Sequence, residues 1–354
     1  MADQLSPSNR SKDAAQKAAK GRISNARSLN RDPMEWANEI QQGNRTALSQ
    51  AITLTESANP PDQLMLDHLL QAIASFSAKE KSIRIGITGV PGVGKSTFIE
   101  CYGQRLIDQG HRVAVLAVDP SSGISKGSLL GDKTRMELLA KESNAYIRPS
   151  PTSSALGGIT RGTHEAILLC EAAGFDRILI ESVGVGQSEV AVRECSDAFI
   201  LLMLPGGGDE LQGIKRGIME MADVLLINKS DGKGIALARE TAAQYMQALH
   251  LLPPNPAGHS VSVQLISALE NQGVLEFDEH LQALVKNWKS NASFEQRRNE
   301  QAVALFAKHV QHLSLQERWG NPEAKKLWSE SVRALKEQRT NPYSAARNWI
   351  KQES

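Results

Sequence analysis

Cysteine is scarce in this chain, which has only three in 354 residues, at Cys101, Cys170 and Cys195. They lie far apart and match none of the short spacings that cysteines adopt around a bound metal ion. So few cysteines fit a reducing compartment, where disulfides are rare. We therefore expect an intracellular protein and place it in the cytoplasm.

The chain also lacks a long apolar run and an excess of charge of either sign. No stretch is long and apolar enough to span a bilayer. Lysine and arginine number 40 against 39 aspartate and glutamate, so there is neither a strongly basic field nor an acidic tail. Nucleic acid and membrane are therefore not expected as partners.

The first 31 residues are polar and rich in Ser, Lys and Arg. Organelle transit peptides and disordered tails share this composition. Asp3 and Asp13 interrupt the transit-peptide pattern, and large apolar residues are scarce. We expect a flexible N-terminal tail over residues 1–31, with a transit peptide as the alternative.

The strongest motif is Gly-Val-Pro-Gly-Val-Gly-Lys-Ser at residues 89–96. It matches G-x-x-x-x-G-K-[ST], the phosphate-binding loop (P-loop). Apolar residues alternate over residues 81–88 and predict a strand that enters the loop. Residues 97–108 predict a helix that leaves it, with Gly110 as the stop signal. Strand, loop and helix thus occur in the order that the motif requires.

The glycines of this loop predict how it binds phosphate. Without side chains they let successive backbone N–H groups turn toward one point, where the start of the next helix adds its dipole. Lys95 then reaches the terminal phosphates, and the Ser96 hydroxyl is placed to bind Mg²⁺. The predicted phosphate-binding residues are Gly89, Val90, Pro91, Gly92, Val93, Gly94, Lys95, Ser96 and Thr97.

Residues 32–80, between the tail and the loop, predict a helical extension. Asp32 followed by Pro33 is typical of a helix start, and Gly43 of its stop. An amphipathic helix with apolar residues at helical spacing follows Pro61. The extension either packs on the core or contacts a partner.

Residues 81–285 alternate short apolar strands with helices. Several strands are nearly continuous in Val, Ile and Leu, which is typical of strands covered on both faces. The pattern predicts an α/β fold, a P-loop domain with a doubly wound, mostly parallel sheet. After the first strand, we expect strands at residues 112–119, 177–182, 198–204, 224–228 and 261–267, with helices such as 161–173 and 235–250 between them.

The C-terminal residues 286–354 contain only predicted helices, separated by Gly-Asn-Pro at 320–322 and Thr-Asn-Pro at 340–342. Such a segment cannot easily close a core of its own, so it should pack on another surface. Two interpretations stay open: an arm that joins two copies of the chain, or a lid folded on its own core.

The second motif is Asn-Lys-Ser-Asp at residues 228–231, directly after a predicted strand. It fits N-K-x-D, which reads guanine. The Asp231 carboxylate can accept hydrogen bonds from the ring N–H and the exocyclic amine of guanine, two donors that adenine does not offer in that geometry. Asn228 belongs to the same motif, and Lys229 would cover the base. After the last strand, the guanine oxygen could accept a hydrogen bond from a backbone N–H of Ser267, Ala268 or Leu269.

Acidic residues stand at the carboxyl ends of two predicted strands, Asp119 and Glu181. Ligands of open α/β sheets bind at that edge. A carboxylate beside a triphosphate would be repelled unless Mg²⁺ bridged them, so we predict Mg²⁺ binding by Ser96, Asp119 and Glu181. Asp119 could instead orient the attacking water. Asp132 is a further metal candidate on a loop.

Two glycine-rich stretches resemble switches. Residues 183–189 follow Glu181, where a γ-phosphate could hold a backbone N–H, and they include Gln187 as a candidate to orient water. Residues 205–210 contain three consecutive glycines and are followed by Lys215. The predicted catalytic residues are Lys95, Asp119, Glu181 and Gln187. Since no arginine finger is evident, we expect slow hydrolysis without a partner.

Together these residues resemble the MeaB/ArgK/MMAA family of P-loop GTPases over roughly residues 32–350. The phosphate loop is shared by many families, whereas the stretches at 181–189 and 205–209 are more particular. The matching motifs are residues 86–97, Val-Asp-Pro-Ser-Ser at 118–122, Gly-Asp-Lys-Thr-Arg-Met at 131–136, Glu-Ser-Val-Gly-Val-Gly-Gln-Ser-Glu at 181–189, Pro-Gly-Gly-Gly-Asp at 205–209, Asn-Lys-Ser-Asp at 228–231 and Asn-Pro-Tyr-Ser-Ala-Ala at 341–346.

The resemblance implies a GTPase that chaperones an adenosylcobalamin-dependent acyl-CoA mutase, typically methylmalonyl-CoA mutase. Such proteins gate cofactor delivery, protect the mutase and form homodimers through their C-terminal helices. By position, Asp119, Asp132 and Glu181 would belong to the Mg²⁺ and switch network, and Lys215 to a third switch that senses the partner. Ser182 stands where Thr is commoner, and Ser230 where Ala is commoner.

Two other functions compete with this one. A nickel-type metallochaperone GTPase would need a Cys or His metal site near the phosphate loop, and the spacings here supply none. A kinase coupled to amino-acid transport, an older label for ArgK-like proteins, would transfer the phosphoryl group to a protein rather than to water.

Overall fold

The computed structural model describes residues 31–57, 59–76, 82–119, 136–151, 158–182, 188–206, 216–251 and 260–351. The chain divides into two compact units, residues 1–298 and 299–354. None of the helices in the described part of the chain is both long and apolar enough to cross a membrane.

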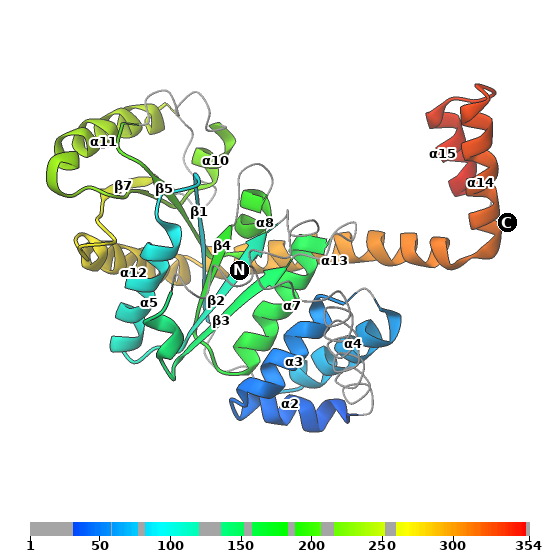
Figure 1. The fold of residues 1–354 in the computed structure, drawn as a ribbon, viewed down its shortest axis with the longest axis horizontal. Coiled ribbons are helices and arrows are strands. Elements are labelled where there is room, and N and C mark those ends of the chain that lie inside the picture. Colours follow the sequence, from blue (N-terminus) through cyan, green and yellow to red (C-terminus); the bar gives the residue numbers. More distant parts are fainter. Residues whose placement is uncertain are drawn as a thin grey trace, which may run out of the picture. The chain divides into compact units, whose positions relative to one another are not determined.

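The first unit is built on a seven-stranded sheet in the order β3-β2-β4-β1-β5-β6-β7, and every pair of neighbouring strands is parallel. Because β1 lies in the middle and the chain moves outward to both sides of it, the sheet is doubly wound (Figure 1). This confirms the predicted fold class. The strands are β1 (Ile83–Gly89), β2 (Val113–Asp119), β3 (Ala145–Pro151), β4 (Arg177–Ser182), β5 (Ala198–Met203), β6 (Val224–Ile227) and β7 (Ser262–Leu265).

Strand β3 is absent from the prediction, which was wrong in this respect. Its sequence contains Pro149 and Pro151, which cannot donate to a sheet ladder and which argue against a central strand. The structure explains their presence, because β3 is an edge strand that pairs with β2 alone. Glu181 therefore ends the fourth strand along the chain and not the third.

Helices cover both faces of the sheet (Figure 1). Within β2, Val113 and Val115 pack in a core with α5 and α12, whereas Leu116 and Val118 pack in a second core with α7, α8 and α11. The sheet is thus buried on both faces, which explains its nearly continuous apolar strands. The helical elements of the unit are α2 (Pro33–Gln41), α3 (Arg45–Thr55), α4 (Pro60–Ala74), α5 (Lys95–Asp108), η2 (Leu139–Lys141), α7 (Gly158–Ala172), α8 (Ser188–Cys195), α10 (Arg216–Met221), η3 (Gly232–Gly234), α11 (Ile235–Leu249) and α12 (Val274–Ser290).

The N-terminal helices α2, α3 and α4 pack on the core through α7. Trp36 is fully buried, and its indole N–H donates to the Ala47 carbonyl oxygen at 3.1 Å. Arg148 of β3 forms an ion pair with Glu56, which directly follows α3, at 2.9 Å. The extension therefore packs on the core of the first unit, which was the first of the two alternatives that the sequence left open.

Helix α13 (Ser293–Gly320) begins in the first unit and continues into the second, which also holds α14 (Pro322–Lys336) and α15 (Pro342–Lys351). In the second unit three indole rings, of Trp319, Trp328 and Trp349, pack with centroid distances of 4.8 to 5.6 Å. The Trp349 indole N–H also donates to the Ala324 carbonyl oxygen at 2.9 Å. The predicted all-helical C-terminal region is confirmed.

Candidate functional site

The loop between β1 and α5 has the backbone shape that only glycines allow. Gly89, Gly92 and Gly94 have φ values of 150°, 77° and 97°. A Cβ at Gly89 would lie 2.4 Å from the Leu202 carbonyl oxygen, and one at Gly94 would lie 2.7 Å from Asn228 Nδ2. Gly94 also offers α5 no side-chain cap, so the first N–H groups of this helix stay available to an anion.

Lys95 is the first residue of α5, and its ammonium group points back across the loop. Its Nζ donates to the Gly89 carbonyl oxygen at 2.8 Å and to that of Val90 at 3.4 Å. Burial lowers the pKa of Lys95, while the charges of Glu181 and Glu189 act to raise it. A cation held in a partly desolvated glycine loop suits the terminal phosphates of a nucleotide.

Ser96 and Glu181 are brought together by α5 and the carboxyl end of β4. The Ser96 hydroxyl donates to Glu181 Oε1 at 3.4 Å, and Glu181 is buried. A hydroxyl and a carboxylate oxygen side by side are the oxygen ligands that Mg²⁺ prefers. These two predicted metal ligands therefore fit the ion.

Glu189 is the last residue of the motif at residues 181–189, and its place in that motif predicts no role for it. It lies in the first turn of α8, is only 6 % exposed, and acts electrostatically on Lys95. Its signal in the sequence was weak, because an acidic residue in the first turn of a helix is common for capping reasons alone.

The other predicted residues of the phosphate side are described only in part. Asp119 is the last residue of β2, opposite Pro151 in register, so its backbone ends at the same sheet edge as Gly89 and Ser182. Asp132, Gln187 and Lys215 lie outside the described residues. Their roles stay predictions.

Asn228 and Lys229 join the predicted guanine-reading segment to the phosphate loop. Asn228 Nδ2 donates to the Val93 carbonyl oxygen at 2.7 Å, and Lys229 Nζ donates to that of Gly92 at 2.8 Å. Lys229 has a left-handed backbone with φ 61°. The two motifs, 132 or more residues apart along the chain, thus form one surface at the carboxyl edge of the sheet.

Asp231 is positioned by the loop after β7. Its Oδ2 accepts a hydrogen bond from the Ser267 hydroxyl, and Ser267 is buried. The Ala268 N–H donates to Asn228 Oδ1 at 3.1 Å, and the Ser267 N–H donates to the Gln272 carbonyl oxygen at 3.0 Å. These backbone groups are used within the protein, so the contact of residues 267–269 with the guanine oxygen stays a prediction.

The site therefore combines a glycine cradle, a lysine, a hydroxyl–carboxylate pair and a carboxylate held by a buried serine. Chemically, the cradle and Lys95 suit a polyphosphate. The fixed Asp231 carboxylate suits a base that offers two donors. The distances above place both halves along one edge of the sheet.

Comparison with known proteins agrees with this arrangement. The family model for "Methylmalonyl Co-A mutase-associated GTPase MeaB" matches residues 48–323. "Probable GTPase Mb1533" from Mycobacterium bovis is 47% identical over 318 residues, which are 89% of this chain and 93% of that protein. The mouse "Methylmalonic aciduria type A homolog, mitochondrial" is 53% identical over 245 residues, which are 67% of this chain and 59% of that protein.

"GTPase ArgK" from Escherichia coli is 41% identical over 316 residues, which are 88% of this chain and 94% of that protein. Among solved structures, "Crystal structure of LAO/AO transport system kinase" has a TM-score of 0.69 and 33% identity, covering 90% of this chain and 96% of that one. The family model alone spans well over half of the chain. The chain therefore belongs to the MeaB family of P-loop GTPases.

Proposed function

We propose that this chain is a GTP-binding and GTP-hydrolysing chaperone that gates delivery of adenosylcobalamin to an acyl-CoA mutase of the methylmalonyl-CoA mutase type and protects that enzyme. The observation that carries the proposal is the family match over residues 48–323, whose description names a mutase-associated GTPase. The shared edge of the glycine cradle and Asp231 supports guanine nucleotide as the regulator.

For hydrolysis we assign Lys95 to the terminal phosphates, and Ser96 and Glu181 to Mg²⁺. When bound, Mg²⁺ would neutralise charge on the phosphates. We assign Asp119 and Asp132 to the same metal and switch network, and Gln187 to the attacking water. Because hydrolysis needs a group that stabilises the transition-state charge, and no arginine is assigned to that task, we expect slow turnover until a partner orders the site.

We also propose that the second unit mediates homodimerisation. Along α13, Val303, Phe306, Val310 and Leu313 recur at spacings of three and four residues and are 44 to 69 % exposed. An apolar stripe at this spacing on one long helix is typical of a helix–helix seam. A second copy of the chain, presenting the same stripe, is the occupant that a two-fold interface would provide.

The deciding experiment measures GTP turnover by the purified chain alone and with a cobalamin-dependent acyl-CoA mutase loaded with or without cofactor. We expect the mutase to change nucleotide affinity, hydrolysis or both, and a non-hydrolysable GTP analogue to alter cofactor transfer. A mutase that changes none of these would contradict the proposal.

A transport-linked kinase is the second candidate, because the solved relative carries that title. It predicts transfer of the γ-phosphoryl group from labelled GTP to a protein, whereas the chaperone predicts release as phosphate. A metallochaperone predicts instead that nickel binding responds to nucleotide. Release of labelled phosphate that depends on the mutase would set both alternatives aside.

We propose a cytoplasmic location. The mouse relative is named as mitochondrial, so the tagged full-length chain should be localised in its own cells. Import into an organelle would overturn the cytoplasmic assignment and favour a transit peptide at residues 1–31.

A further inference from the structure

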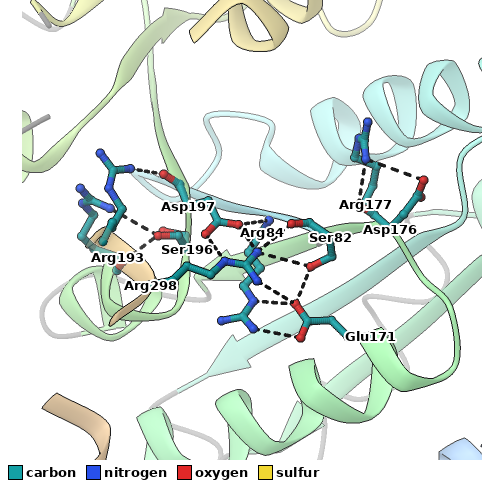
Figure 2. Close-up of polar contacts among 10 residues, drawn as sticks. Ser82, Arg84, Glu171, Asp176, Arg177, Arg193, Ser196, Asp197 and Arg298 are labelled. Atoms are coloured by element: carbon teal, nitrogen blue, oxygen red, sulfur yellow. Dashed lines mark hydrogen bonds and ion pairs between the residues drawn. The ribbon is translucent and has the colours of Figure 1, made fainter. Parts of the chain in front are cut away.

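The opposite, amino edge of the sheet carries a group of buried and partly buried charged side chains (Figure 2). We name it the amino-edge ion cluster. It contains four guanidinium groups and three carboxylates, from Arg84, Arg193, Arg297, Arg298, Glu171, Asp197 and Asp223. Such a cluster depends on the exact placement of its members, because uncompensated charge is costly in a protein interior.

Asp197 is the centre of the cluster and is only 1 % exposed. Its carboxylate accepts from Arg298 Nε at 2.7 Å and Nη2 at 2.6 Å, and from the Arg84 backbone N–H at 2.8 Å. Arg298 also donates to the Ser82 carbonyl oxygen at 2.7 Å. Arg298 therefore anchors α13 to the starts of β1 and β5, at the point where the first unit ends.

A second anchor lies beside the first. Arg297 donates to both carboxylate oxygens of Asp223, at 3.3 and 3.4 Å, and its guanidinium lies 4.8 Å from the centre of the Trp288 ring. Arg297 also bonds to the Asp197 carbonyl oxygen. Trp288 is buried, so its indole reports directly on this part of the cluster.

Helix α8 connects this cluster to the phosphate loop. Glu189, at its first turn, acts on Lys95, whereas Arg193, near its other end, is partly buried, donates to the Ser196 carbonyl oxygen at 3.4 Å and lies in the field of Asp223, Arg297 and Asp197. Between them α8 lies directly on β1, because a Cβ at Gly86 would come within 2.7 Å of Val192 Cγ1. So close a contact leaves little room for one end of α8 to move without the other.

We infer that α8 transmits the state of the nucleotide from the phosphate loop to the amino-edge ion cluster and so to the root of α13. The inference rests on the proposed guanine-nucleotide site. A γ-phosphate near Lys95 would repel the Glu189 carboxylate, whose charge already acts on the same ammonium group. Displacement of α8 would then move Arg193 and redistribute the pairing of Asp197 and Asp223 with Arg297 and Arg298.

The test uses the full-length chain labelled with 5-fluorotryptophan and observed by ¹⁹F NMR. The chain has five tryptophans, and the Trp288 resonance is assigned by Trp288→Phe. We expect this resonance to differ between saturating GDP and a non-hydrolysable GTP analogue, both with Mg²⁺. Affinities for the two nucleotides are measured in parallel by titration calorimetry.

Arg193→Met is the variant that interrupts the connection. It keeps an unbranched apolar stem in place of the arginine and removes the guanidinium, which leaves three guanidinium groups against three carboxylates, so no carboxylate of the cluster is left in excess. We expect nucleotide affinities within about twofold of the original chain and loss of the nucleotide-dependent shift of Trp288. Arg339→Met, at an exposed ion pair with Glu337, is the matched control and should keep the full shift.

A Trp288 resonance that is the same with both nucleotides would overturn the inference, as would a full shift in Arg193→Met. If that variant does not fold, Glu189→Gln tests the other end of α8, and a full shift there would equally overturn it. Failure of both nucleotides to bind would instead be read in the calorimetry and would overturn the proposed function together with this inference.

Discussion

The two edges of the same sheet are built on opposite principles. At the carboxyl edge, glycines keep side chains away, a helix start is left uncapped, and Lys95 bonds only to loop carbonyls among the contacts described above. At the amino edge, Asp197 and Asp223 are almost fully buried and accept several hydrogen bonds each. The first edge keeps its polar groups ready for a ligand, whereas the second uses them within the fold.

This difference predicts which property a substitution at each edge should change. Removing a charge at the carboxyl edge should weaken nucleotide binding and leave the free energy of unfolding nearly unchanged. Removing a charge at the amino edge should lower the free energy of unfolding and leave nucleotide binding nearly unchanged.

Lys95→Ala should have the largest effect on binding. It removes the cation that we expect to make more than one charged hydrogen bond to phosphate, each of roughly 1.5–3 kcal/mol, so GTP affinity should fall about a thousandfold. Isothermal titration of GTP and GDP measures the change. Lys141→Ala, in an exposed turn, is the control. Unchanged affinity in Lys95→Ala would defeat the placement of this lysine at the phosphates.

Asp231→Asn should alter the choice of base rather than the affinity for phosphate. The amide keeps one acceptor but places a donor against guanine, so the preference for GTP over ATP should shrink by roughly two to four orders of magnitude. Competition of ATP against labelled GDP measures it. Asp108→Asn, on the exposed end of α5, should keep the original preference. A full preference in Asp231→Asn rejects this residue as the guanine reader.

Asp223→Asn should show the opposite behaviour at the amino edge. Asp223 is fully buried, accepts from the Phe199 N–H at 2.8 Å and pairs with Arg297, so its charge balances a buried guanidinium. We expect the free energy of unfolding to fall by about 3 kcal/mol, with nucleotide affinity changed less than about twofold. Urea denaturation and calorimetry measure the two quantities.

Asp176→Asn is the control for that change, because the Asp176 carboxylate also has several partners but is half exposed: it contacts His111 at 2.9 Å and Arg177 at 3.7 Å and accepts from the Arg112 N–H at 2.9 Å. Surface pairs of this kind contribute about 0–1 kcal/mol. Equal destabilisation by Asp176→Asn and Asp223→Asn would show that burial does not distinguish the amino edge.

The sequence predicts the carboxyl edge much better than the amino edge. Residues 89–96 and 228–231 are contiguous motifs, and their chemistry follows from a few residues at fixed spacing. The partners of Asp197 are different in kind. Arg298 lies 101 residues from Asp197 along the chain. Elsewhere in the cluster, Glu171 lies 87 residues from its partner Arg84. Only the assembled sheet brings the members of the amino-edge ion cluster together, so no local sequence pattern predicts it.

The same reasoning explains the missed elements. Strand β3 ends in Arg-Pro-Ser-Pro, which argues against a strand locally, and only its place at the edge of the sheet makes it acceptable. Helix α8 has eight residues, too few for a periodic apolar pattern to stand out, and it is fixed by packing on β1 at Gly86. In both cases tertiary contacts decided what the local sequence left undetermined.

The smallest effect concerns pH and a histidine beside the amino-edge ion cluster. His164 of α7 is only 8 % exposed, and its Nδ1 has no hydrogen-bond partner among the described residues. Burial and the nearby charges of Arg84 and Arg298 lower its pKa from 6.5 to about 4, although Glu171 acts in the other direction. The folded protein therefore keeps this imidazole neutral, since a proton would add a further cation beside the guanidinium groups of Arg84 and Arg298.

The sign of the effect follows from proton binding. Between pH 6.5 and about 4 the unfolded chain holds a proton on His164 that the folded chain does not, so acid favours unfolding in this window. Between pH 7.5 and pH 5 this one group should cost about 2 kcal/mol of the free energy of unfolding. In His164→Leu that loss should be smaller by the same amount, whereas His68→Leu, at an exposed position of α4, should behave like the original chain. Urea denaturation at the two pH values gives the comparison, and parallel losses in all three proteins would place the acid sensitivity outside the cluster.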